Sequence, residues 1–213
     1  VIAPERSGSG KVLFANDPHI GYGQPSVWFE AHMETPDFTM YGYHLAGSPF
    51  APVGHTREYA VGLTMFLNDD TQFYREKANP DNPNQVMYKG EWVDLEVRKE
   101  IIKVKDGEDV EIEVRRSKHG PIVNDGFAQV KEEDPIALWW TYLEVENDLM
   151  EPSYMLAHAN GIEDVQKAAS MIVAPGLNVM YGDIHGNIGH WAAGKLPRYA
   201  DSVNTAQYLD GTS

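Results

Sequence analysis

Two short polar segments and one asparagine within an apolar run are the residues of this chain that could do chemistry. The first, residues 16–21 (Asn-Asp-Pro-His-Ile-Gly), follows the apolar run 12–15, which predicts a buried strand. Pro18 lacks an amide N–H and fixes φ, so strand pairing should stop there. A strand that ends in such a turn can present a side chain and a backbone N–H to a reacting group. A plain structural turn is the more common reason for the same pattern.

The second segment, residues 68–71 (Asn-Asp-Asp-Thr), crowds carboxylate and amide oxygens directly after an apolar strand. Calcium prefers ligands of this kind. An Asx-rich turn without an ion fits the same residues equally well. One loop cannot supply six or more ligands, so a calcium site here would need residues from elsewhere in the chain.

The third candidate is Asn178, which lies between Leu177 and Val179 in a strand-like run. A buried amide within an apolar strand must be hydrogen-bonded. The same amide could donate to the oxyanion that develops during acyl transfer. Taken without context, the residues favour the structural role.

Other catalytic motifs are missing from the sequence. Its eight histidines form no H-E-x-x-H motif and no close pair on a helix face, so structural or solvated histidines are favoured over zinc ligands. Residues 7–10 (Ser-Gly-Ser-Gly) have the wrong spacing for a phosphate loop, and no G-x-S-x-G elbow occurs. Cysteine is absent, which excludes disulfides, thiolate zinc sites and cysteine nucleophiles.

Composition limits the class of partner. The chain has 213 residues, 42% of them apolar, which is enough for a substantial core. Its formal net charge is −15, and a surface this acidic repels phosphate backbones, so nucleic-acid binding is not expected. No run of 18 apolar residues occurs, so no membrane span is predicted.

The elements that must position these residues are mostly short strands, followed by two helices and two more strands. Helices are predicted over 147–159 and 161–172, and residues 79–84 and the tail from Lys195 are predicted to be irregular. Strands are predicted over 11–16, 26–34, 37–45, 58–66, 72–77, 85–89, 92–104, 109–116, 122–124, 136–143, 176–184 and 188–194. This order predicts an α+β fold in one domain, residues 1–213, with helices layered on antiparallel sheets.

Seven segments, taken in order, resemble the β subunit of the penicillin acylase family of N-terminal-nucleophile hydrolases. The resemblance covers nearly the whole chain, and the order and spacing of the segments are far more specific than any one of them. The segments are FANDPHIG (14–21), PSVWFEAH (25–32), GSPF (47–50), VGHTREYAVG (53–62), NDDTQFY (68–74), KHGPI (118–122) and YGDIHGNIG (181–189).

The resemblance implies an αββα sandwich and a precursor that cuts itself, so that the new N-terminal Ser of the β subunit is the nucleophile and its α-amine the base. By position, His19 should help to orient the nucleophile, while the Met65 N–H and the Asn178 amide should form the oxyanion hole. This context reverses the preference for a purely structural Asn178.

The resemblance also implies ligand sites. Ile20, Val53 and Leu63 match positions near the acyl pocket and suggest an apolar acyl group, although ordinary core packing explains the same residues. Asp69, Thr71 (through its carbonyl) and Gln72 match a structural calcium site, but Gln72 stands where many members carry an acidic ligand. No organic cofactor is expected. The resemblance further implies a periplasmic or secreted protein.

The chain departs from the family at its start, because the Ser-Asn-x-Trp-like segment expected directly before Val1 is absent. Ser7 and Ser9 cannot replace it, since an internal Ser has no free α-amine. We therefore expect the N-terminal part of a β subunit, inactive by itself, without its α subunit and the rest of the β subunit, and open to self-association through its strand edges.

The expected substrate is a small amide; penicillins, acyl-homoserine lactones, lipopeptides and aryl amides all suit an apolar pocket. Two other functions stay open at this point. One is a non-catalytic binding or scaffold domain on the same fold, and the other is a calcium-dependent β-rich module.

Overall fold

The computed structural model describes residues 1–124 and 126–213, which form two compact units. Unit 1 consists of Val1–Asn68 and Val145–Leu196, and unit 2 of Asp69–Glu144 and Pro197–Ser213. The single domain expected over residues 1–213 stays a prediction.

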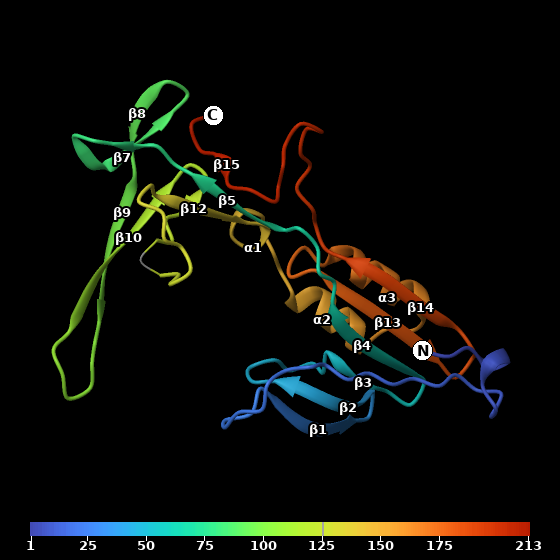
Figure 1. Ribbon diagram of the computed structural model, residues 1–213. Helices are drawn as coiled ribbons and strands as arrows, with labels where there is room; N and C mark the ends of the chain where they lie inside the picture. Colours follow the sequence, from blue (N-terminus) through green and yellow to red (C-terminus); the bar gives the residue numbers. More distant parts are fainter. Residues whose placement is uncertain (125) are drawn as a thin grey trace. The chain divides into compact units, whose positions relative to one another are not determined.

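Unit 1 is built on an antiparallel sheet with the strand order β1-β2-β3-β4-β13-β14 (Figure 1). A short 3₁₀ helix, η1 (Pro4–Arg6), lies near the start of the chain. The strands are β1 (Trp28–Thr35), β2 (Phe38–Leu45), β3 (Val53–His55), β4 (Tyr59–Met65), β13 (Leu177–Asp183) and β14 (Ile188–Ala193). The sheet therefore places the late strands β13 and β14 directly beside the early strand β4, a pairing set by tertiary structure.

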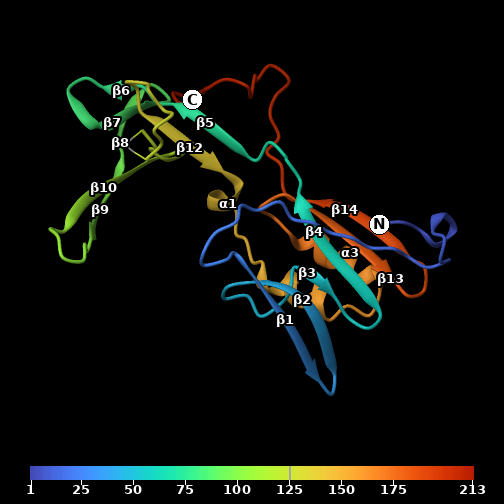
Figure 2. The same cartoon turned by 60° about the horizontal axis from the view of Figure 1, so that its bottom comes forward.

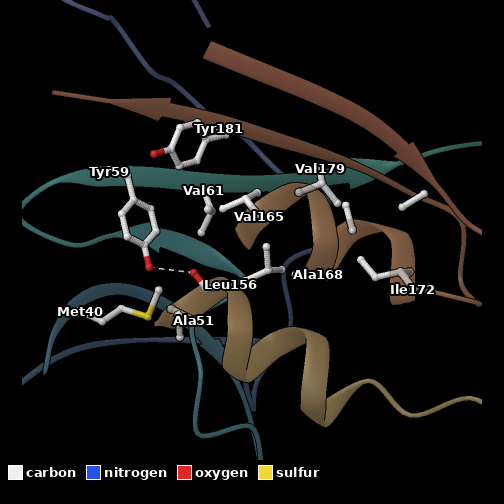
Figure 3. Close-up of a cluster of buried hydrophobic side chains, with 13 residues drawn as sticks. Met40, Ala51, Tyr59, Val61, Leu156, Val165, Ala168, Ile172, Val179 and Tyr181 are labelled. Carbon is white, nitrogen blue, oxygen red and sulfur yellow. Dashed lines mark hydrogen bonds between the residues drawn. The ribbon is translucent and has the colours of Figure 1, made fainter. Parts of the chain in front are cut away.

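Helices α2 (Met150–Ala157) and α3 (Ile162–Met171) pack on one face of this sheet and bury the main core (Figure 3). Helix α3 contributes Val165, Ala168 and Ala169, whose spacing places them on one side of the helix. Tyr59 on β4 reaches the end of α2, where its hydroxyl donates to Leu156 O (2.9 Å) and accepts from Ala159 N (3.1 Å). Burial raises the pKa of Tyr59 to about 12, so this hydroxyl stays neutral and keeps both bonds.

The N-terminal segment lies across the opposite face of the sheet. A Cβ placed on Gly62 would lie 2.2 Å from Asn16 Oδ1, and one placed on Gly182 would lie 2.8 Å from a methyl carbon of Val12. These two glycines therefore let residues 12–16 lie close to β4 and β13. The strand predicted over 11–16 is wrong, because this segment packs face-on against the sheet and its only isolated bridge in the described residues joins Leu13 to Ile2.

The described residues of unit 2 form three small sheets and a short helix, α1 (Thr141–Glu144) (Figure 2). In one sheet β5 (Thr71–Arg75) pairs antiparallel with β12 (Ile136–Trp140) and parallel with β15 (Leu209–Asp210). The other strands are β6 (Ala78–Asn79), β7 (Asn82–Tyr88), β8 (Glu91–Asp94), β9 (Glu96–Ile102), β10 (Val110–Ser117) and β11 (Gly120–Pro121).

Several predicted boundaries in unit 2 are wrong. Of the loop expected at 79–84, only residues 80–81 form the turn of the β6–β7 hairpin, because Asn79 ends β6 and residues 82–84 begin β7. The strand expected at 92–104 is divided between β8 and β9. The strand expected at 136–143 ends at Trp140, because Thr141 turns to donate its N–H and hydroxyl to Asp70 O. At 122–124 only Ile122 forms a bridge, and the polar tail supplies β15.

The β9–β10 hairpin confirms one prediction and corrects another. Residues 105–108 (Lys-Asp-Gly-Glu) predict a hairpin turn, because an Asp-Gly pair tolerates positive φ, and Asp106 adopts a φ of 60° in the turn between the strands. In the strand predicted over 109–116, apolar residues such as Val110 and Ile112 alternate with charged ones, a pattern that predicts one buried face. Instead, these side chains are 47% and 39% exposed, because no other element of the described chain covers the hairpin there.

The predicted fold class is confirmed: the chain is α+β, its sheets are mostly antiparallel, and its two main helices lie outside the sheet.

Candidate active site

Asn178 lies on β13, on the sheet face opposite the helices. It pairs with Thr64 across the ladder, while its neighbour Val179 pairs with Leu63 and is fully buried beneath α3. Because side chains alternate along a strand, Asn178 and Thr64 share the face away from this core. The sequence predicts the strand, but the direction of the Asn178 side chain, away from the helices, follows only from where the helices pack.

The side chain of Asn178 contacts three groups. Its Nδ2 lies 3.0 Å from Met65 O and 3.2 Å from Thr64 Oγ1, and its Oδ1 lies 2.9 Å from His190 Nε2. Met65 O can only accept a hydrogen bond, which fixes the amide nitrogen on the β4 side. The structure thus brings together two of the predicted site residues, Asn178 and Met65.

The backbone of Met65 suits the predicted oxyanion role. Phe66 N donates to Gly176 O (3.0 Å), so the alternation of an antiparallel ladder directs the N–H of Met65 away from β13. On that side β3 pairs only with Ala60 and Val61, so the described β3–β4 ladder ends before Met65. The side chain of Met65 is 57% exposed and is not required for a main-chain role.

His19 lies on an exposed turn. Its side chain is 89% exposed and pairs with Asp17 at 3.4 Å. The start of the turn is attached to β4, because Asn16 Nδ2 donates to Leu63 O (3.2 Å). The turn therefore begins two residues along β4 from Met65, while the His19 ring itself is not brought onto Asn178.

The three predicted acyl-pocket residues lie in different environments. Val53 is buried and lines two hollows of about 240 and 210 Å³, each shared with Asn16 and Tyr43. Leu63 packs against the core on the helix side of the sheet, and Ile20 is 46% exposed. The acyl-pocket role stays a prediction for all three; of them, Val53 lies beside the turn that carries His19.

The predicted calcium residues lie at the start of β5 in unit 2. Gln72 is 2% exposed, and its Nε2 donates to Asp69 Oδ1 at 2.8 Å. The amide N–H thus contacts the carboxylate oxygen that a cation would bind. Asp69, the Thr71 carbonyl and the Gln72 amide oxygen give at most one charged ligand, short of the six or more oxygens that calcium prefers. By themselves these residues do not fit a calcium ion.

Asp183 secures the turn between β13 and β14. Its carboxylate accepts hydrogen bonds from the Tyr181 hydroxyl (3.0 Å), the N–H of His185 (2.9 Å), and the N–H and Nδ2 of Asn187 (both 2.8 Å). Burial opposes ionisation, but these hydrogen bonds outweigh it and lower the pKa of Asp183. The turn therefore fixes the register of the two strands that carry Asn178 and His190.

Sequence reasoning did not select Thr64 and His190, the other two residues of this site. Thr64 was not distinguished from the rest of its strand. His190 was considered only as a metal ligand, although its place two residues before Ala192, the ladder partner of Asn178, makes it a diagonal neighbour of Asn178 on the same face and could have indicated contact.

The described residues include no helix long and apolar enough to cross a membrane. No group of three or more potential metal-binding side chains occurs among them either.

The profile of one protein family, penicillin amidase, matches residues 1–213. An acyl-homoserine lactone acylase from Pseudomonas aeruginosa is 29% identical over 206 residues, which cover 92% of this chain and 24% of that protein. Penicillin G acylase from Escherichia coli is 26% identical over 198 residues, which cover 92% of this chain and 23% of that protein. The chain thus spans about a quarter of the length of these relatives.

Among solved structures, a thermostable penicillin G acylase from Alcaligenes faecalis superposes with a TM-score of 0.86 at 25% identity. The match covers 98% of this chain and 37% of that one. Sequence and structure comparisons therefore agree along nearly the whole chain.

Proposed function

Because the chain belongs to the penicillin amidase family, we propose that it is the part of an amidohydrolase that holds the oxyanion hole for cleaving an amide-linked apolar acyl group. One observation carries the proposal: Asn178 Nδ2 donates to the carbonyl oxygen of Met65 (3.0 Å) on the sheet face opposite the helices, so the amide lies beside the residue whose N–H is the second proposed donor. An amide donor beside a backbone N–H is the arrangement that stabilises a tetrahedral oxyanion.

In the proposed reaction the nucleophile is an N-terminal Ser supplied by a segment outside this chain. Its Oγ attacks the amide carbonyl while its α-amine takes the hydroxyl proton, and the carbonyl oxygen becomes an oxyanion that accepts from Asn178 Nδ2 and the Met65 N–H. Collapse breaks the C–N bond and returns the proton to the leaving amine. Water then attacks the acyl-Ser ester and releases the acid.

The position of Val1 supports this arrangement. A Cβ placed on Gly182 would lie 3.4 Å from a methyl carbon of Val1, and Gly182 alternates onto the same face of β13 as Asn178. A nucleophile segment directly before Val1 would therefore start on the sheet face that Asn178 occupies.

Other parts of the proposal rest on family membership. The parent protein contains an α subunit and further β-subunit sequence, binds a small amide, and is periplasmic or secreted. In it His19 orients the nucleophile, and Ile20, Val53 and Leu63 lie near the acyl group. Asp69, Thr71 and Gln72 contribute to a calcium site only if other residues complete the ligand set.

Amide hydrolysis by the full-length protein that carries this segment tests the proposal. Acyl p-nitroanilides of increasing acyl length, a penicillin and an acyl-homoserine lactone serve as substrates. Release of acid and amine from at least one of them is expected, and a purified, processed protein that hydrolyses none of them contradicts the proposal.

The variant Asn178→Ala tests the residue that carries the proposal. Loss of one oxyanion donor should lower kcat by about 10²–10³-fold with little change in thermal stability, since the amide is exposed. Asn160→Ala is the matched control, because it removes another exposed amide of unit 1, one that donates to Asp164 four residues along the chain, and should leave kcat unchanged. Near-parental turnover in Asn178→Ala would remove Asn178 from the oxyanion hole.

A further inference from the structure

The Asn178 amide contacts an imidazole on its oxygen side. His190 projects from the edge strand β14 and its Nε2 lies 2.9 Å from Asn178 Oδ1. We propose that His190 is a positioning residue for Asn178: it donates its Nε2–H to the amide oxygen and so holds the amide nitrogen toward the oxyanion. This inference rests on the proposed function.

The hydrogen-bonding capacity of each atom determines the direction of this contact. Met65 O can only accept, so the side of the amide that faces it is nitrogen, and the side that faces His190 is oxygen. An amide oxygen can only accept, so Nε2 of His190 carries the proton. Met65 and His190 therefore enforce the same amide orientation, one from each neighbouring strand.

The contact has two consequences for catalysis. Without the Nε2–H donor, the Asn178 amide can rotate and present its oxygen to the developing oxyanion. The two negative oxygens would then repel each other. Donation to Oδ1 also draws electron density away from Nδ2 and makes its N–H groups stronger donors, because hydrogen bonds in a chain polarise one another.

The oxyanion can take the place of the weaker partner of Nδ2. Thr64 Oγ1 lies at 3.2 Å and its hydroxyl can turn to another partner, whereas Met65 O at 3.0 Å cannot change its role. One N–H of Asn178 would then move from Thr64 to the oxyanion while the other stays on Met65. The bond from His190 would keep the plane of the amide fixed during this exchange.

Kinetics of two His190 variants in the full-length protein test the inference. His190→Phe keeps a flat ring but removes the donor, and kcat should fall about five- to tenfold with KM nearly constant, as expected for one neutral hydrogen bond. His190→Gln restores an N–H donor at the position of Nε2 and should recover most of the loss. His185→Phe, an exposed histidine in the same hairpin, is the control and should leave kcat unchanged.

A spectroscopic measurement separates failure of this inference from failure of the proposed function. Selective ¹⁵N-histidine labelling, with His190→Phe for assignment, reports which ring nitrogen of neutral His190 is protonated. The Nε2–H form is expected, and a dominant Nδ1–H form overturns the contact even if the wild type hydrolyses no substrate. If the wild type is active and His190→Phe retains its kcat, the positioning role is refuted while the proposed function stands.

Discussion

Removing the carboxylate of Asp183 tests whether one turn determines the geometry of β13 and β14. The side chain is 7% exposed and accepts four hydrogen bonds, one of them from the buried Tyr181 hydroxyl. Asp183→Ala leaves that hydroxyl without its acceptor and frees the N–H groups of the turn. Asp183→Asn keeps one acceptor oxygen but replaces the other by an NH₂ group that faces the Nδ2 of Asn187.

The expected loss follows from this arrangement. An unpaired buried hydroxyl costs about 1–3 kcal/mol, and the turn N–H groups, which can reach water, add about 1 kcal/mol, so Asp183→Ala should lose about 3 kcal/mol of unfolding free energy. Asp183→Asn should lose about 1–2 kcal/mol, because hydrogen bonds to a charged acceptor are roughly twice as strong as neutral ones.

The pKa of Asp183 gives this prediction a pH dependence. Its folded-state pKa is lowered below the ordinary Asp value of about 3.9, so the ionised carboxylate stabilises the fold fully at pH values well above 3.9. That contribution is lost as the pH falls through the lowered value. The difference between wild type and Asp183→Asn should therefore be constant from about pH 5 to 7 and shrink below about pH 4.

Urea unfolding at pH 7, 5 and 3, followed by circular dichroism, measures these differences. Asp37→Asn, in the exposed turn between β1 and β2, is the matched control and should change stability by less than about 0.5 kcal/mol. If Asp183→Ala is no less stable than the control, or if the difference between wild type and Asp183→Asn grows in acid, the reasoning is refuted.

Two further predictions concern the N-terminal segment and the calcium residues. Gly62→Ala should destabilise the fold by about 1–3 kcal/mol in the same urea assay, because its methyl group would collide with Asn16. Gly8→Ala is the control, since Gly8 has open space around it. Equal stabilities of the two variants would contradict the close packing of Asn16 on Gly62. Gln72→Glu should place a second carboxylate beside Asp69, lowering the melting temperature in chelator and increasing the stabilisation by added calcium relative to wild type. An identical calcium response in both proteins would argue against a cation at this position.

Local pattern predicted most of the elements but not their ends. Strands at 26–34, 37–45, 58–66 and 188–194 were expected close to β1, β2, β4 and β14, because alternation and turn residues are local properties. The strand expected at 11–16 is wrong because its apolar residues pack on glycines of the sheet, a contact that local sequence does not reveal. Hydrogen bonds to Asp70 likewise end β12 before Thr141.

The residues of the candidate site likewise fall into those that the sequence predicted and those that only the structure revealed. Asn178 and Met65 were expected from the resemblance, and the structure places them in contact. His190 was missed because its role depends on the facing strand and on a choice of amide orientation, which no spacing rule encodes.

The sequence by itself determined the α+β class, the approximate strands, the absence of thiol chemistry and the resemblance to acylases, since composition, periodicity and ordered motifs are all readable along one chain. Tertiary structure decided which side of β13 faces away from the helices, which main-chain N–H is directed away from the ladder, and which imidazole contacts Asn178. These features depend on helices and strands from distant parts of the chain, because a residue's exposure and hydrogen-bond partners are set by what packs around it.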